Sequence, residues 1–278
     1  MRAELQKKID NSIKLLKSIK IDEGEAVELA YSGGKDSDVI LQLAKEAGIN
    51  YRAIYKNTTI DPRGTIKHVK DMGVEIRRPQ KTFAELIAKK GMPNRFRRFC
   101  CKELKEYKIL DKVIIGVRKA ESIKREKIYR EPTACRYYGA KTEKNHVVAY
   151  YPILDWDNQD ILEFIIDRAI SIHPLYYRED GSIDISRRLG CMCCPLQSKK
   201  KRIEDFKKNH GMIKYYLNGL REYMRTHPIR KYKNEYEFFI REVFFEKQED
   251  YERQQQKSLF TCETEAKKLL EDFFKIRL

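Results

Sequence analysis

Short apolar runs and amphipathic stretches alternate along the chain up to about residue 170. Runs apolar enough for buried strands lie at 26–31, 51–56, 74–77, 112–117 and 147–153. Apolar residues at helical spacing predict helices over 38–47, 65–72, 82–90 and 158–169. This alternation predicts an α/β fold, with an open, mainly parallel sheet of about five strands and flanking helices.

Both ends of the chain predict further helices. The first 25 residues mix charge with apolar residues at helical spacing and lack the apolar region of a signal peptide. An irregular loop over 171–198 leads into a charge-rich helical extension. We therefore expect four parts: an N-terminal helix (1–25), the α/β domain (26–170), the loop (171–198) and a helical C-terminal extension (199–278).

Aromatic residues are interleaved with basic ones throughout the extension. They are Tyr215, Tyr216, Tyr223, Tyr232, Tyr236, Phe238, Phe239, Phe244 and Phe245. Such a mixture can bind single-stranded nucleic acid by stacking. Aromatic residues at helical spacing are more often buried, and we interpret these as core.

The segment between the first predicted strand and its helix reads Ser-Gly-Gly-Lys-Asp-Ser. A helix start presents unpaired N–H groups and the positive end of the helix dipole. Two glycines let the backbone approach an anion closely, the lysine adds a full charge, and the serines add hydroxyl donors. The turn predicts a phosphate cradle, made of Ser32, Gly33, Gly34, Lys35, Asp36 and Ser37.

Two commoner phosphate motifs do not fit this turn. The nucleoside triphosphate P-loop requires a glycine where this chain has Leu29. The dinucleotide fingerprint requires a third glycine, which does not follow here. The alternative interpretation is a glycine-rich turn that binds no ligand.

The loop after the second strand should face the same crevice, because ligands of open α/β sheets bind beyond the carboxyl ends of the strands. Its candidate ligand contacts are Thr58, Thr59 and Asp61. The proline that follows Asp61 favours an extended or turning backbone just before it. The alternative is an ordinary polar loop.

A second candidate segment follows the fourth strand. Arg118 and Arg125 can hold phosphate or sulfate oxygens in a bidentate manner. Glu121 can orient one of these arginines, and Ser122 follows it. Alternatively, Arg118 and Glu121 form only a surface ion pair of little energy.

Composition narrows the class of partner. The formal net charge of +16 suits nucleotides, sulfate or nucleic acid, although lysine-rich surfaces also serve solubility alone. No run of about eighteen apolar residues occurs, so we expect no membrane span and a cytoplasmic location.

Five of the seven cysteines fall into two clusters, Cys100–Cys101 and Cys191–Cys194, the second of which includes Cys193. Disulfides are rare in a reducing compartment, and Cys-x-x-Cys spacing can place two sulfurs on one metal centre. The clusters therefore indicate a zinc or iron–sulfur site. The arginine-rich segment 95–98 should lower the pKa of the adjacent thiols.

Five motifs in this order resemble the phosphoadenosine phosphosulfate (PAPS) reductase family of the N-type ATP pyrophosphatases, known as the PP-loop superfamily. They lie at 32–37, 57–62, 98–105, 116–125 and 152–156, within residues 26–195. The resemblance implies an adenine nucleotide α-hydrolase-like fold. It also implies that ATP or an adenylyl sulfate binds at the turn with Mg²⁺.

The resemblance further implies roles for individual residues. Lys35, Arg118 and Arg125 would be catalytic. The nucleotide would be bound by Ser32, Gly33, Gly34, Lys35, Asp36, Ser37, Thr58, Thr59, Asp61, Arg118, Glu121 and Ser122. A 4Fe–4S cluster would be held by Cys100, Cys101, Cys191 and Cys194.

The remaining cysteines receive no role from the resemblance. Cys193 stands where close relatives usually have glycine, so it is left out of the ligand set. It is the first substitute if that set is wrong. Cys135 and Cys262 match no motif.

Two departures from the family direct the choice of chemistry. Sulfonucleotide reductases usually carry an altered turn, whereas this one is intact, as in the members that cleave ATP. Reductases also carry a nucleophilic cysteine in a C-terminal Glu-Cys-Gly motif, and Cys262 lies in a different context. We therefore expect ATP-dependent adenylylation of an acceptor followed by sulfur transfer, with nucleic acid as a family precedent for the acceptor.

Two alternatives stay open at this point. One is a reductase that releases sulfite from adenylyl sulfate or PAPS with electrons from thioredoxin. The other is a non-catalytic module that binds a nucleotide or nucleic acid. For the ATP-dependent reaction, the expected partners are an adenine nucleotide, nucleic acid as acceptor, and a cysteine desulfurase as sulfur donor.

Overall fold

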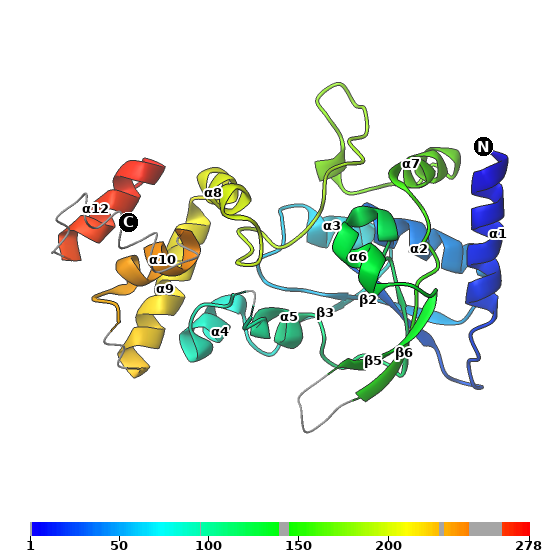
Figure 1. The fold of residues 1–278 in the computed structure, drawn as a ribbon, viewed down its shortest axis with the longest axis horizontal. Helices are drawn as coiled ribbons and strands as arrows, with labels where there is room; N and C mark the ends of the chain where they lie inside the picture. The colour runs from blue at the N-terminus through cyan, green and yellow to red at the C-terminus, as the bar shows by residue number, and fades with distance from the viewer. Residues whose placement is uncertain (1, 95, 139–144, 228–230, 245–262) are drawn as a thin grey trace. The chain divides into compact units, whose positions relative to one another are not determined.

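The computed structural model describes residues 2–94, 96–138, 145–227, 231–244 and 263–278. The chain divides into two compact units (Figure 1). The sheet unit comprises Met1–Asn57, Asp61–Arg78 and Lys102–Gly190. The helical unit comprises Thr58–Ile60, Pro79–Cys101 and Cys191–Leu278.

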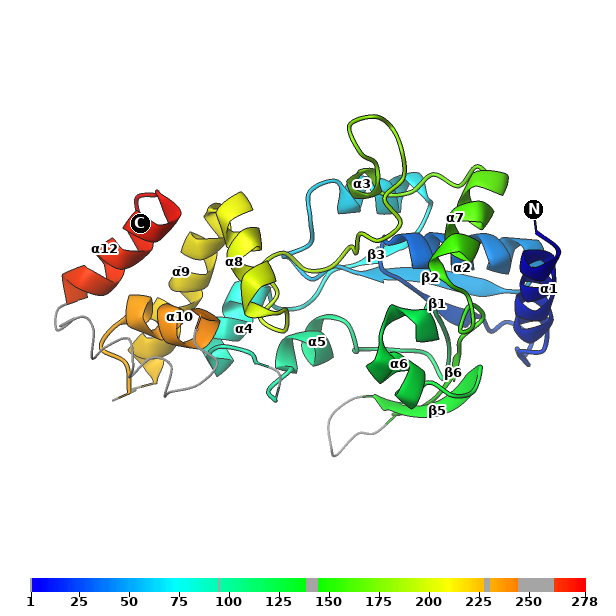
Figure 2. The same cartoon turned by 45° about the horizontal axis from the view of Figure 1, so that its top comes forward.

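The sheet unit contains six described strands in the order β3-β2-β1-β4-β6-β5. Figure 2 shows β2 beside β1 and β5 beside β6. Their bounds are β1 Val27–Tyr31, β2 Tyr51–Lys56, β3 Glu75–Arg77, β4 Lys112–Ile115, β5 Thr133–Tyr138 and β6 Asn145–Tyr150. The first four pairings in this order are parallel, and β5 pairs antiparallel with β6 at the edge. This confirms the predicted open, mainly parallel sheet, with one strand more than expected.

The extra strand, β5, was missed because its side chains carry no apolar alternation. Residues 133–136 are exposed or only half-buried, as befits an edge strand. The strand predicted over 147–153 ends at Tyr150, because the chain then turns. In that turn the N–H groups of Leu154 and Trp156 donate to the carbonyls of Tyr151 and Ile153.

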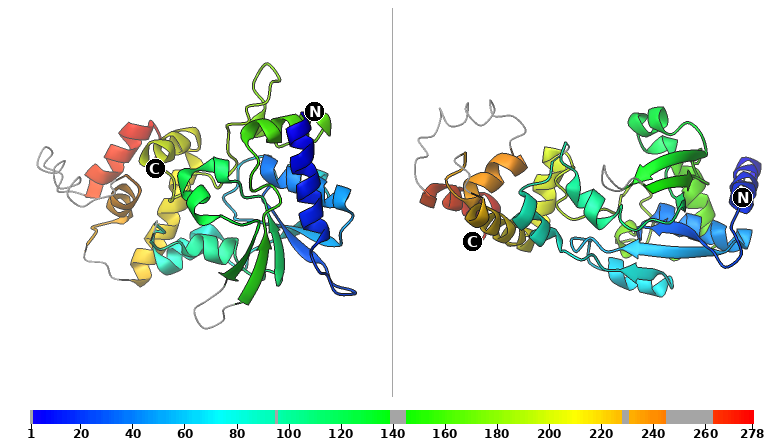
Figure 3. Two further views of the ribbon diagram at one scale, coloured as in Figure 1. Left: turned by 45° about the vertical axis from the view of Figure 1, so that its right-hand side comes forward. Right: turned by 90° about the horizontal axis from the view of Figure 1, so that it is seen from below.

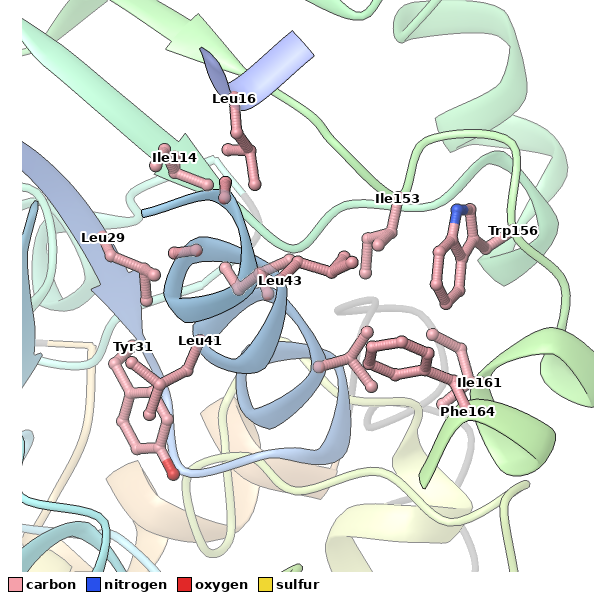
Figure 4. Packing of buried hydrophobic residues seen from close by; sticks show 14 of the residues in the cluster. Leu16, Leu29, Tyr31, Leu41, Leu43, Ile114, Ile153, Trp156, Ile161 and Phe164 are labelled. Atoms are coloured by element: carbon pink, nitrogen blue, oxygen red, sulfur yellow. The ribbon is translucent and has the colours of Figure 1, made fainter. Parts of the chain in front are cut away.

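Helices α1, α2, α3 and α7 contribute to one main core with the sheet, whereas α6 has no buried residue. Their bounds are α1 Ala3–Lys17, α2 Lys35–Ala47, α3 Thr65–Asp71, α6 Ile123–Ile128 and α7 Asn158–Asp167, with short 3₁₀ turns η1 Lys119–Glu121 and η2 Pro174–Tyr176. Figure 4 shows Leu29 and Ile114 of the strands beside Leu43 of α2, with Trp156 and Phe164 next to them. α1 packs on α2 (Figure 3). Burial of the central strands agrees with their apolar sequence, as is usual for parallel sheets.

The helical unit is built from α4 Phe83–Lys90, α8 Lys199–Lys208, α9 Gly211–Thr226, α10 Glu235–Phe244 and α12 Glu263–Phe274, with part of α5 Phe99–Leu104. Its centre is aromatic. Tyr216 lies 5.2 Å from Phe83 and 5.4 Å from Phe206 between ring centroids, and Phe206 lies 5.3 Å from Phe239. These rings are fully buried. Of the aromatic residues predicted as core, Tyr216, Tyr232, Phe238 and Phe239 are buried, whereas Tyr215, Tyr223 and Tyr236 are only half-buried. The side chain of Phe244 is not among those described. Phe245 lies outside the described residues.

Among the described helices, none has both the length and the apolar character needed to span a membrane.

Helix α4 packs closely against α9 at Gly219. A Cβ at Gly219 would lie 3.0 Å from both the Ala84 carbonyl oxygen and the Ile87 Cβ. Overpacking of this kind costs about 1–3 kcal/mol, so Gly219→Ala should lower the free energy of unfolding in urea by that amount. Gly211→Ala in the same helix meets nothing within 4 Å and should change it by less than about 0.5 kcal/mol. Equal effects would contradict this close approach.

Candidate functional site

The Ser-Gly-Gly-Lys-Asp-Ser turn joins β1 to α2, as the sequence predicts. Gly33 has a φ of 76°, a conformation that glycine adopts without strain. Gly34 is the N-cap of α2, and its carbonyl accepts hydrogen bonds from the N–H and the hydroxyl of Ser37, at 2.8 and 2.6 Å. The Ser32 hydroxyl lies 3.2 Å from that of Ser37. The turn is therefore ordered and places both serine hydroxyls at the start of α2.

Lys35 is buried at this helix start, with 3% of its surface exposed. Its Nζ donates to Asp36 Oδ2 at 3.3 Å and to the Arg187 carbonyl at 3.4 Å. Burial lowers the pKa of Lys35; the Asp36 carboxylate opposes this shift, and the charge of Arg118 adds to it. The turn thus holds a lysine charge in a poorly solvated position, where an anionic ligand would compensate it.

Tyr176, in η2, covers the first amide of α2. Its hydroxyl accepts hydrogen bonds from the N–H groups of Lys35 at 3.3 Å and Leu189 at 3.2 Å. A Cβ on Gly34 would lie 3.2 Å from this hydroxyl, so the second glycine also makes room for the tyrosine. Burial raises the pKa of Tyr176 to about 12, so the hydroxyl stays protonated at neutral pH. No motif or spacing in the sequence pointed to this contact.

Arg118 is almost fully buried, and each of its three guanidinium nitrogens donates a hydrogen bond to a protein group. Its Nε donates to Asp36 Oδ1 at 2.7 Å, Nη1 to the Trp156 carbonyl at 3.4 Å, and Nη2 to Asn158 Oδ1 at 3.1 Å. The guanidinium therefore ties the first turn of α2 to the segment before α7. It brings together three segments that the sequence analysis treated as separate motifs.

Glu121 lies between two arginines. Its carboxylate pairs with Arg125 and, at 2.8 Å, with Arg188, whose Nη2 also donates to the Glu121 carbonyl at 3.1 Å. The same carboxylate accepts the N–H of Arg118 at 3.2 Å. Ser122 caps α6 by accepting the Arg125 N–H at 3.2 Å, so its hydroxyl has a structural partner.

The side chains of Arg125 and Arg188 remain 37% and 50% exposed. Burial lowers the pKa of Arg125, and the charge of Arg188 adds to this shift. Counting Lys35 and Arg118, four cations here share the two carboxylates of Asp36 and Glu121. The excess of positive charge favours an anion, and Arg188 is a member of this group that the sequence analysis did not single out.

A buried polar network lies behind the turn. Asp38 in α2 accepts hydrogen bonds from the Tyr31 hydroxyl and from His68 Nε2, the latter at 3.0 Å. Burial raises the pKa of Asp38, and the hydrogen bond from His68 opposes this rise. Next to it, His173 Nε2 lies 3.3 Å from the Thr65 hydroxyl. These partners come from distant parts of the chain, and no spacing in the sequence pointed to them.

The candidate residues after β2 are divided between the two units. Asp61 belongs to the sheet unit and accepts a hydrogen bond from Tyr55 at 2.6 Å. Thr58 and Thr59 belong to the helical unit. There the Thr59 hydroxyl accepts the Phe83 N–H at 2.9 Å.

All cysteines of the two clusters belong to the helical unit. Cys100 is buried, and its pKa is raised first by a hydrogen bond with Cys101, then by burial and by the nearby Cys194. Cys191 Sγ donates to the Thr58 hydroxyl at 3.5 Å. The structure thus brings the two clusters together across the intervening sequence.

The aromatic core supports this proximity. Burial raises the pKa of Tyr216, and neighbouring thiols, among them Cys194, Cys100 and Cys191, raise it further. Its hydroxyl donates to the Cys193 carbonyl at 2.8 Å. The four thiols are a suitable donor set for zinc or an iron–sulfur cluster. In the described part of the chain, however, no three His, Cys, Asp or Glu side chains are arranged to hold a metal ion.

The prediction that the arginines lower the thiol pKa is wrong for Cys100, whose pKa is raised. Arg98 does contact Cys101, with Nη2 at 3.8 Å from Sγ, but Cys100 faces the interior, where a second thiol and burial dominate. Cys193 is also buried and has a φ of 50°. Cys135 is exposed on β5 of the sheet unit, and Cys262 lies outside the described residues.

The mainly parallel sheet, with the Ser-Gly-Gly-Lys-Asp-Ser turn between β1 and α2, is the arrangement expected from the sequence for the PP-loop superfamily. Residues 26–197 match the family model of the phosphoadenosine phosphosulfate reductase domain, and the chain belongs to this family. This confirms the resemblance drawn from the five motifs.

Among curated proteins, the chain is similar to the uncharacterized protein MJ0973 of Methanocaldococcus jannaschii. The two are 31% identical over 206 residues, which is 69% of this chain and 47% of that protein. The chain therefore spans about half the length of this relative.

Likenesses to solved structures are looser. A PAPS reductase from Candida auris is 14% identical, with 69% of this chain and 96% of that chain covered and a TM-score of 0.43. The U34-tRNA thiolase NcsA from Methanococcus maripaludis, solved with its [4Fe-4S] cluster, is 16% identical, with 80% and 79% covered and a TM-score of 0.44. The FMN adenylyltransferase of Candida glabrata is 16% identical, with 65% and 62% covered and a TM-score of 0.46.

The buried charge of Lys35 should cost stability in the free protein. Because its pKa is lowered on folding, the cost is present below the folded-state pKa and fades as the pH rises towards 10.5. Lys35→Met should therefore raise the free energy of unfolding in urea at pH 7, by about 1 kcal/mol. The gain should shrink as the pH approaches 10.

Lys45→Met, at the exposed end of the same helix, is the matched control and should change little at either pH. A Lys35→Met variant with a lower free energy of unfolding than the wild type at pH 7 would contradict the claim that this buried charge destabilises the free protein.

Proposed function

We propose that this protein is an ATP-dependent enzyme that adenylylates an acceptor and prepares it for sulfur transfer. The observation that carries the proposal is the intact Ser-Gly-Gly-Lys-Asp-Ser turn with Lys35 buried at the start of α2. An enzyme that cleaves ATP between the α- and β-phosphates needs a cradle for the pyrophosphate that leaves. Helix amides, serine hydroxyls and a lysine that lacks a full counter-charge supply one.

In this proposal the β- and γ-phosphates bind at the turn, with Mg²⁺ from solution. Their oxygens accept from the α2 amides and from Lys35 Nζ, in place of Tyr176 and the Arg187 carbonyl, which occupy those donors at 3.3 and 3.4 Å. The Ser32 hydroxyl adds a donor, whereas the Ser37 hydroxyl donates to the Gly34 carbonyl at 2.6 Å and holds the turn. Binding would relieve the unfavourable burial of the lysine charge.

The arginines divide into two roles. Arg125 and Arg188 are partly exposed on Glu121, so their free N–H groups are suited to charge that develops at the α-phosphate. Arg118 is bound to protein groups, including Asp36 at 2.7 Å. It acts by holding the turn in place and by adding to the positive potential.

The chemistry proceeds by in-line displacement at the α-phosphorus. An acceptor oxygen forms a bond to phosphorus, the bond to the bridging oxygen breaks, and pyrophosphate leaves with the electron pair. The acceptor proton passes to solvent. The outer sulfur of a persulfide, of the kind that a cysteine desulfurase supplies, then forms a bond to the activated carbon of the acceptor, and AMP leaves with the electron pair of the broken carbon–oxygen bond. A thiol reductant then cleaves the disulfide that joins acceptor and donor, which leaves the sulfur on the acceptor.

The thiols of the helical unit are the proposed cluster ligands. Cys100, Cys101, Cys191 and Cys194 would hold a 4Fe–4S cluster, and the proximity of Cys100 to Cys101 and Cys194 supports this set. When bound, such a cluster supplies iron that can hold sulfur or pass on electrons.

Reduction of adenylyl sulfate or PAPS, with thioredoxin as electron donor, is the second candidate. The match of residues 26–197 to the PAPS reductase domain favours it. The nucleophilic cysteine that this reaction requires has no matching motif. Release of labelled sulfite from PAPS would support the reductase over the ATP-dependent reaction.

Lys35→Ala tests nucleotide binding. Loss of a charged hydrogen bond should weaken the affinity for ATP by about 1.5–3 kcal/mol in titration calorimetry. Lys45→Ala, in the exposed last turn of α2, is the matched control and should bind ATP as the wild type does. Equal affinities of wild type and Lys35→Ala would leave the turn as a structural element only.

Cys194→Ser tests the cluster. After anaerobic purification, the wild-type protein should be brown and contain iron, and Cys194→Ser should lose both colour and iron. Because metal–thiolate bonds contribute to folding energy, the segment after Pro195 should also become more sensitive to protease.

The control is Cys135→Ser, which removes an exposed thiol of the sheet unit and should change neither property. Full iron content and an unchanged spectrum in Cys194→Ser would show that the ligand set is wrong, and Cys193 would be tested next.

A further inference from the structure

Phe96 stands out on the surface of the helical unit. Its side chain is 98% exposed, whereas the other exposed large hydrophobic residues of the described chain range from 37 to 72%. Burying such a ring would gain about 1.5–3 kcal/mol, so its exposure carries a cost. Phe99, three positions further on, is by contrast partly buried, and Lys90 Nζ lies over its ring, 5.6 Å from the centroid.

Hydrogen bonds with Asn94 hold the backbone of Phe96 and Arg97. The Asn94 side-chain oxygen accepts hydrogen bonds from the N–H groups of Phe96 at 3.0 Å and Arg97 at 2.9 Å. The Asn94 N–H donates to the Arg97 carbonyl at 3.3 Å. The backbone amides of Phe96 and Arg97 are therefore both bound by the same side chain.

Two exposed arginines follow the ring directly. Within the described residues Arg97 forms no ion pair; its Nη2 donates only to the Met92 carbonyl, at 3.4 Å. Arg98 reaches back to the cysteine pair, with Nη2 at 3.8 Å from Cys101 Sγ. The partner of this surface should therefore offer a flat apolar face together with negative charge.

We propose that Phe96, Arg97 and Arg98 form a platform on which an unpaired base of a single-stranded nucleic acid stacks, with its phosphates on the arginines. Base–aromatic stacking accepts any base, and arginines beside it neutralise the backbone. A duplex does not fit, because its bases are already stacked and paired. The net charge of +16 supports an anionic polymer as partner.

The platform is close to the cysteines that the proposed function uses. Cys100 follows Phe96 by four positions, and a chain of that length spans at most about 14 Å. This step rests on the proposed function: the stacked nucleotide, or its neighbour, is then the acceptor that receives sulfur. The stacking itself does not depend on that reaction.

The test uses the full-length protein, purified anaerobically, and single-stranded RNA and DNA oligonucleotides that carry 2-aminopurine. Stacking on Phe96 should quench the probe fluorescence on binding. Phe96→Leu keeps an apolar side chain but removes the aromatic face, and should weaken binding by roughly 5- to 150-fold and abolish the quench. Phe96→Trp should retain both.

Ile166→Ala, which removes another exposed apolar side chain, is the control and should bind as the wild type does. The proposal is overturned if Phe96→Leu binds and quenches like the wild type, if a duplex of the same sequence binds equally well, or if the wild type binds no oligonucleotide. The second result would indicate charge attraction alone, and the third would favour a protein partner at Phe96.

ATP affinity separates this proposal from the proposed function. Phe96→Leu should bind ATP as the wild type does in calorimetry. If the wild type binds no ATP but the oligonucleotide results hold, the proposed reaction fails and the stacking platform stands.

Discussion

The buried ion pair between Arg118 and Asp36 is the interaction on which the geometry of the sheet unit's site depends. Asp36 lies in the first turn of α2, and Arg118 follows the central strand β4. The same guanidinium donates to the Trp156 carbonyl and to Asn158. Gly116 makes this approach feasible, because a Cβ there would lie 3.0 Å from the Asp36 carbonyl oxygen. The pair thus holds the Ser-Gly-Gly-Lys-Asp-Ser turn against the end of β4 and the segment that begins α7.

With the turn fixed in this way, the distribution of charge follows. Lys35 cannot move far from the start of α2, and it shares Asp36 with Arg118. Glu121 is likewise shared by Arg125 and Arg188. Each carboxylate therefore orients two cations without neutralising both. Such a site lowers the stability of the free protein, and a bound anion would offset this loss. Binding sites often reduce stability in this way.

Much of the fold could be predicted because it depends on local pattern. The βα alternation gave the parallel sheet, and the spacing of Ser32 to Ser37 gave the turn at the start of α2. Tyr176, Arg188 and the Asp38–His68 pair were missed because they meet the turn only through tertiary contacts, which leave no period in the sequence. The direction of the pKa shift of Cys100 was predicted wrongly. The arginines close to it in the sequence suggested a lowered pKa, whereas in the fold a second thiol and burial raise it.

Isotope exchange between labelled pyrophosphate and ATP tests the central claim most directly. The reaction proposed here is reversible up to the release of pyrophosphate, so label should enter ATP when the protein, Mg²⁺ and a single-stranded nucleic acid acceptor are present together. Arg188→Ala should slow the exchange, because we propose that this arginine stabilises the negative charge that develops at the α-phosphate. Failure of wild-type protein with bound ATP to incorporate label under these conditions would contradict the account.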